Sequence, residues 1–192
     1  SDGKKIPFDD PMNSYQWNLN NTGDKNVAAT ARKGADVGVI DAWKLTAGSP
    51  DVIVAVCDAP VKYTHPDLAG SMWVNEAELN GVKGVDDDGN DYIDDIHGYN
   101  FYKRGGSNGA INWETETESG HGTHVAGIVA AVNGNGIGVS SVAGGSGKGD
   151  GVRLMCCQVF EGIYSDGDRG MSEALMYAAD NGACIVQCSY GY

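Results

Sequence analysis

Two histidines lie three residues apart in a glycine-rich stretch whose composition suits acid–base chemistry. The stretch is Ser119-Gly-His121-Gly-Thr-His124-Val-Ala-Gly127, and it continues into the apolar residues 128–132. This pattern predicts a loop that becomes a buried helix, with glycines that let another backbone approach His121. An imidazole has an ordinary pKa of about 6.5, so a rigidly held histidine at the start of a helix is a candidate general base at neutral pH.

Two other interpretations of this pair remain open. His121 and His124 would share one face of a helix, so they could ligate a metal ion together. No glutamate follows His121 as in the zinc-protease pattern, and the helix offers no third ligand. Either histidine could instead be an ordinary hydrogen-bonded residue of the core.

A carboxylate follows the first predicted strand. Residues 52–56 are Val-Ile-Val-Ala-Val, and such an unbroken apolar run predicts a strand buried on both faces of a parallel sheet. Asp58 lies just beyond it, at the edge where open α/β sheets place their functional groups. Taken alone, Asp58 would be interpreted as an ordinary turn aspartate, so a functional role depends on its pairing with the His121 motif.

Further elements alternate along the chain. Residues 152–160 and 183–188 are predicted to be strands, and residues 172–182 a helix that stops at a glycine. Together with the strand at 52–56 and the helix at 119–132, the order is β, α, β, α, β, which predicts an α/β fold with a doubly wound parallel sheet. Residues 1–9 are expected to form an irregular lead-in to one domain at 10–192.

Both motifs together resemble the subtilisin-like serine proteases (subtilases). His121-Gly-Thr-His-Val-Ala-Gly127 is similar to the segment around that family's catalytic histidine, and Asp51-Val-Ile-Val-Ala-Val-Cys-Asp58 to the one that ends in its catalytic aspartate. The resemblance extends from about residue 10 to residue 192. It implies a serine endopeptidase that works by acyl transfer, with Asp58 orienting His121. Ala59-Pro60 departs from the family's pattern, and proline removes a backbone donor, so an altered turn is expected after Asp58.

The nucleophile of that family is missing from the sequence. The family's serine lies in a Gly-Thr-Ser-Met-Ala motif downstream of the histidine, and these 192 residues contain no such motif. The resemblance therefore implies the N-terminal part of a subtilisin-like domain, inactive alone, whose partner is the missing C-terminal portion of the same domain. The alternative is a truncated or degenerate protease-like domain that binds peptides or calcium without catalysis.

Two segments are implied to bind the substrate. By the same resemblance, an extended peptide or protein substrate would lie between Ser165-Asp166-Gly167 and Ser189-Tyr190-Gly191. Such binding works by strand addition, in which backbone hydrogen bonds hold the peptide and side-chain pockets select it. Either segment could equally be an ordinary turn.

An acidic stretch indicates a calcium site. Residues 84–95 include six aspartates and an asparagine, and hard oxygen ligands around a tight turn suit Ca²⁺. The spacing is not that of an EF-hand, but some subtilases carry a similar structural calcium insertion. The candidate ligands are Asp86, Asp88, Asn90, Asp94 and Asp95, with a backbone carbonyl near Tyr92. A solvated acidic turn is the alternative.

Composition excludes some partners. The formal net charge is -13, which argues against nucleic acid or an anionic membrane surface, because both attract clustered Lys and Arg. No apolar run approaches the roughly 20 residues of a membrane span. The five cysteines lack zinc-type spacing and favour small buried thiols over a disulfide framework. The resemblance implies a secreted, periplasmic or cell-surface protein whose signal has been removed.

Overall fold

Four parallel strands form the centre of the molecule in a computed structural model that describes residues 5–102, 109–114, 119–161, 164–165 and 168–191. Every adjacent pair in this sheet is parallel, which confirms the predicted sheet. The spatial order is β2-β3-β1-β6, with β1 at Ile53–Asp58, β2 at Gly98–Asn100, β3 at Arg153–Gln158 and β6 at Ile185–Cys188.

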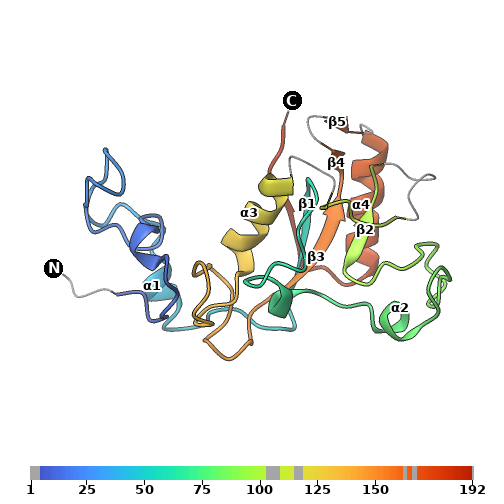
Figure 1. The fold of residues 1–192 in the computed structure, drawn as a ribbon, viewed down its shortest axis with the longest axis horizontal. Helices are drawn as coiled ribbons and strands as arrows, with labels where there is room; N and C mark the ends of the chain where they lie inside the picture. The colour runs from blue at the N-terminus through green and yellow to red at the C-terminus, as the bar shows by residue number, and fades with distance from the viewer. Residues whose placement is uncertain (1–4, 103–108, 115–118, 162–163, 166–167, 192) are drawn as a thin grey trace.

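Two long helices cover the two faces of this sheet. Helix α3 (Ser119–Ala130) and helix α4 (Asp168–Asp180) lie on opposite sides of the strands (Figure 1). Alternate residues of a strand point to opposite faces, so Val54 and Val56 pack in the core under α3, while Ala55 and Cys57 pack under α4. This burial on both faces explains why residues 53–57 of β1 are apolar without interruption.

The shorter elements lie around this centre. They are the helices α1 (Val39–Ala42) and α2 (Glu76–Asn80), the single-turn 3-10 helices at Asn13–Tyr15 and Ala69–Ser71, and the antiparallel pair β4 (Phe160–Glu161) and β5 (Tyr164–Ser165). Residues 5–9 contain no helix or strand, but Ile6 is buried against Leu19 and Val39. None of the described helices has the length and apolar character that a membrane crossing requires.

Helix boundaries differ from those predicted. Helix α3 contains the whole histidine motif and ends at Ala130 instead of 132, so the expected loop is already helical at Ser119. Helix α4 begins at Asp168 instead of residue 172. Its first turn was not predicted, because that segment is polar and contains Gly170. Its end agrees with the predicted glycine stop. Gly182 has a φ of 81°, and the Ala183 N–H donates to the Ala178 carbonyl, the bond that closes a Schellman motif.

Candidate active site

Asp58 is the last residue of β1 and is only 1% exposed. Its Oδ1 accepts a hydrogen bond of 2.7 Å from the backbone N–H of Ala59. Its Oδ2 is also buried and has no partner among the described residues. Burying a carboxylate costs free energy unless hydrogen bonds or an ion pair compensate it. The group that contacts Asp58 therefore shows how this cost is offset.

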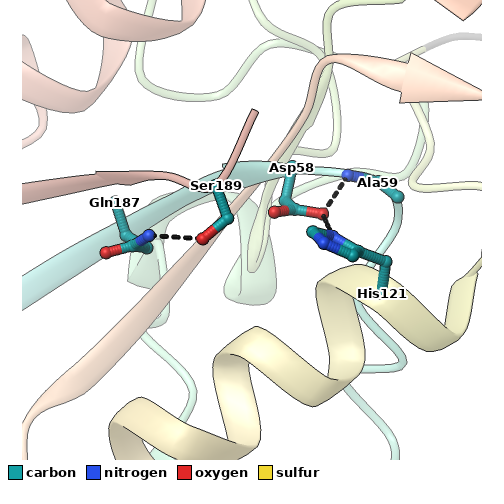
Figure 2. A network of polar contacts seen from close by, with 5 residues as sticks. All are labelled: Asp58, Ala59, His121, Gln187 and Ser189. Carbon is teal, nitrogen blue, oxygen red and sulfur yellow. Dashed lines mark hydrogen bonds and ion pairs between the residues drawn. The ribbon is translucent and has the colours of Figure 1, made fainter. Parts of the chain in front are cut away.

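That group is the imidazole of His121, in the first turn of α3. Its Nδ1 lies 2.6 Å from Oδ1 of Asp58, although 63 residues separate the two in sequence (Figure 2). With Nδ1–H donating to the carboxylate, the ring is held in one tautomer and one orientation. The His121 side chain is 56% exposed, so Nε2 carries the free lone pair at an open surface. This arrangement can move a proton at Nε2.

Close backbone packing holds α3 against the turn that follows Asp58. A Cβ atom on Gly122 would lie 2.1 Å from the carbonyl oxygen of Ala59, so only glycine fits there. Thr123 makes a second contact between α3 and this turn, because its Oγ1 accepts a 2.9 Å hydrogen bond from the backbone N–H of Lys62. The glycines around His121 were predicted to allow such an approach, and Gly122 is the one that needs it.

The residues after Asp58 are Ala59 and Pro60. Ala59, and not Pro60, supplies the N–H that Asp58 accepts. The missing donor of Pro60 therefore does not affect the carboxylate.

His121 and His124 have different neighbours in the fold. Nδ1 of His121 faces Asp58, whereas His124 lines a separate cavity of about 500 Å³ together with His65 and Trp17. Neither histidine belongs to a group of three close ligand atoms in the described parts of the chain. The geometry thus favours the acid–base interpretation over a shared metal ion.

Phe160 connects the described parts of the two implied peptide-binding segments. Ser165 ends β5 and pairs with Phe160 of β4, and the Phe160 ring packs edge-on against Tyr190 at a centroid distance of 4.8 Å. Asp166 and Gly167 lie outside the described residues. Phe160 was not singled out in the sequence, where it looked like the end of a strand.

Ser189 occupies the same edge of the sheet, beside Asp58 (Figure 2). Its Oγ accepts a 2.6 Å hydrogen bond from the Gln187 side chain, and no hydrogen bond links it to His121 within the described residues. Gly191 lies beyond β6, outside any helix or strand.

Three carboxylates of the acidic region converge. Ligand oxygens of Glu78, Asp86 and Asp88 lie within 4.8 Å of one another. Sequence inspection missed Glu78 because it lies on α2, outside the aspartate run. It is buried, and its two oxygens accept backbone N–H groups of Asp87 and Asp94 at 2.6 and 2.8 Å. Glu78 therefore organises the loop from inside.

Other predicted ligands have different partners. Asp95 is fully buried and accepts hydrogen bonds from the Tyr177 hydroxyl at 2.6 Å and the Asn75 amide at 3.0 Å. Burial raises the pKa of Asp95 above its ordinary value. Both oxygens of Asp94 accept the backbone N–H of Gly84. The Asn90 amide donates to Asp88 and Asp95. The hydrogen bonds of Asn90, Asp94 and Asp95 therefore hold the loop in place around the carboxylates of Glu78, Asp86 and Asp88.

A comparison with protein families decides the assignment. The model of the subtilase family (Peptidase S8) matches residues 49–192. The chain belongs to the subtilase family. It is 34% identical over 189 residues to subtilisin-like protease 1 of Plasmodium vivax, covering 98% of this chain but 26% of that protein. The halolysin-like extracellular serine protease Nep of Natrialba magadii is 29% identical over 154 residues, or 78% of this chain and 22% of that protein.

A solved structure confirms the predicted subtilisin-like α/β fold. The Aeromonas sobria serine protease, solved in complex with its chaperone, matches with a TM-score of 0.66 at 24% identity, covering 100% of this chain and 27% of that protein. This subtilase chain thus spans about a quarter of the length of these three relatives.

Proposed function

We propose that this subtilase chain supplies the aspartate and the histidine of a serine endopeptidase. Asp58 orients the imidazole, and His121 is the general base and acid. The observation that carries the proposal is the 2.6 Å contact between Oδ1 of Asp58 and Nδ1 of His121, because it leaves Nε2 free on an exposed ring.

The proposed reaction is acyl transfer to a serine. Nε2 of His121 takes the proton from the serine hydroxyl as its oxygen attacks the peptide carbonyl, and later returns it to the leaving amine. Asp58 stabilises the imidazolium between these steps. The serine and the oxyanion donor come from the rest of the same domain. An extended peptide or protein substrate lies along Ser165-Asp166-Gly167 and Ser189-Tyr190-Gly191.

We expect the 192-residue chain to be catalytically inactive by itself. Losing the serine removes the covalent route and leaves only weak residual catalysis. A serine-directed fluorophosphonate should therefore leave the intact mass of this chain unchanged, whereas a longer product with a Gly-Thr-Ser-Met-Ala segment should be labelled on that serine. Labelling of the 192-residue chain would contradict the proposal. If the longer product resists labelling, the alternative of a binding domain without catalysis is favoured.

We also propose that the acidic loop binds structural Ca²⁺. Carboxylate oxygens are the hard ligands that this ion prefers, and those of Glu78, Asp86 and Asp88 are close enough to share one ion. No lysine or arginine among the described residues forms an ion pair with these carboxylates. The structure thus favours Glu78, Asp86 and Asp88 as direct ligands, with Asn90, Asp94 and Asp95 supporting them.

Chelation is expected to lower the melting temperature of the chain, because an ion that binds only the folded state stabilises it by mass action. Glu78→Gln should lower the melting temperature in calcium and abolish most of the response to chelator. The matched control is Glu76→Gln, two residues earlier on the exposed side of α2, which should keep the full response. An unchanged melting temperature of the original chain in excess chelator would count against the site.

We infer a location outside the cytoplasm, in the secreted, periplasmic or cell-surface compartment. The support is kinship with a relative described as extracellular. The acidic net charge of -13 is compatible with a soluble substrate and unfavourable for nucleic acid.

A further inference from the structure

Three polar residues form a row across the carboxyl ends of adjacent strands. Gln158 of β3 is in register with Asp58 of β1 on one side and with Asn100 of β2 on the other. Register partners on neighbouring parallel strands point to the same face of a sheet, so the three side chains lie on the face that α3 covers. Each residue is at most 2% exposed. Only Asp58 has a part in the proposed proton transfer.

Gln158 uses both ends of its side-chain amide. Its Oε1 accepts a 2.8 Å hydrogen bond from the backbone N–H of Asn112, and its Nε2 donates a 3.1 Å hydrogen bond to the backbone carbonyl of Phe160. A carboxylate could only accept and an ammonium group could only donate, so an amide is suited to bridge an N–H and a carbonyl. Gln158 thus connects the segment before α3 to strand β4.

The Phe160 end of this bridge lies at the proposed peptide-binding edge. The Val159 N–H donates a 2.9 Å hydrogen bond to the Asp58 carbonyl, so β4 begins one residue beyond a direct contact with β1. Phe160 pairs with Ser165, which belongs to one of the two segments proposed to bind the substrate. Fixing the Phe160 carbonyl therefore fixes where this edge lies relative to Asp58.

The Asn112 end of the bridge lies beside the turn that follows Asp58. The neighbouring Ile111 packs against the core under α3, and the Trp113 ring lies edge-on to the Tyr63 ring at a centroid distance of 6.0 Å. Residues 111–113 are therefore held between the sheet and this turn, and Gln158 links them to β4.

From this bridge we infer that Gln158 is a positioning residue for the peptide substrate, an inference that rests on the proposed peptide-binding edge. The Gln158 amide bonds to backbone on both sides and not to the His121 imidazole. It keeps β4 and residues 111–113 at a fixed spacing, so an extended peptide meets an edge that is already ordered and binding costs less free energy. Removing the bridge should weaken peptide binding and spare the proton transfer between Asp58 and His121.

Gln158→Met tests this role, because methionine is similar in length and removes both hydrogen bonds. Asn100→Leu is the matched control in the same row. Asn100 also accepts one backbone N–H, from Tyr102 at 3.0 Å, and donates to one backbone carbonyl, of Ala110 at 3.2 Å. Both of its partners lie between β2 and the segment before α3, and neither is in β4. The two variants should lower the melting temperature by similar amounts, and only Gln158→Met should disturb β4.

Peptide binding is measured with fluorescein-labelled casein by fluorescence anisotropy. The protein is the longer product that contains the serine, with His121→Ala so that the casein is not hydrolysed. We expect Gln158→Met to raise the Kd by about tenfold, the order expected for two lost hydrogen bonds, and Asn100→Leu to raise it by less than about twofold. With His121 restored, kcat for casein hydrolysis should change by less than about threefold in either variant, because the lost interaction belongs to binding.

Equal Kd values for the two variants, an unchanged Kd in Gln158→Met, or no casein binding by the parent protein would overturn the inference. If Gln158→Met fails to fold, hydrogen exchange in the parent protein decides. Casein should slow exchange at the Asn112 N–H and leave the Tyr102 N–H unchanged, and the same response at both would overturn the inference. A parent protein that binds casein but never cleaves it would contradict the proposed peptidase and leave the Kd comparison valid.

Discussion

Replacing His121 by alanine in the assembled peptidase is expected to lower kcat by about 10⁶-fold, a magnitude known for subtilisin itself and not calculated from this structure. The reason is that no other described imidazole has its Nδ1 hydrogen-bonded to Asp58. KM should change little, because the lost proton transfer belongs to the transition state and not to substrate binding. Steady-state hydrolysis of a peptide substrate, corrected by active-site titration, measures both constants.

His124→Ala is the matched control for that experiment. It removes an exposed histidine three residues further along the same helix, one that lines a different cavity. We expect its kcat to stay within tenfold of the unmodified peptidase. If the two variants lost activity equally, the helix and not the His121 imidazole would be the sensitive feature, and the assignment would be wrong.

Gly122→Ala is expected to disturb both stability and catalysis. The new methyl group would meet the Ala59 carbonyl at 2.1 Å, and a backbone carbonyl can move away only if the turn after Asp58 moves with it. Overpacking of this kind costs about 1–3 kcal/mol in the free energy of unfolding. A displacement of about 1 Å between catalytic groups can cost about 10²-fold in rate. Denaturant unfolding and peptide hydrolysis measure the two effects.

Gly127→Ala provides the contrast within the same helix. Apart from the neighbouring backbone of the helix itself, no atom of the described residues lies within 4 Å of a Cβ added at Gly127, and alanine is a better helix former than glycine by about 0.5–1 kcal/mol. We therefore expect Gly127→Ala to stabilise the chain slightly and to leave the rate unchanged. Equal losses in the two glycine variants would show that close packing against Ala59 is not what Gly122 provides.

The central strands could be predicted because their apolar composition directly indicates burial on both faces of a sheet. Residues 52–56 are apolar on both faces, and the structure places a helix against each face. Asp58 and His121 could be paired only through the family resemblance, because 63 residues of chain carry no information about contact by themselves. Their predicted roles stay predictions, although the geometry they require is present.

Features created by long-range contacts escaped prediction. Glu78 lies outside the aspartate run in sequence, and only folding brings it from α2 to that loop. The packing of Phe160 on Tyr190 joins residues 30 positions apart, and local propensity cannot report such a contact. The prediction of buried thiols is confirmed for Cys57, Cys156 and Cys157, whereas Cys184 and Cys188 are exposed in the described chain.

The most direct test of the account is the proton between Asp58 and His121. In ¹⁵N-histidine-labelled chain at low temperature, a proton on Nδ1 of His121 that is shared with a carboxylate should resonate far downfield of the other imidazole protons. We predict that this signal is present in the original chain and in His124→Ala, and absent in Asp58→Ala. A His121 Nδ1 proton without a downfield shift, or a signal that survives Asp58→Ala, would contradict the assignment.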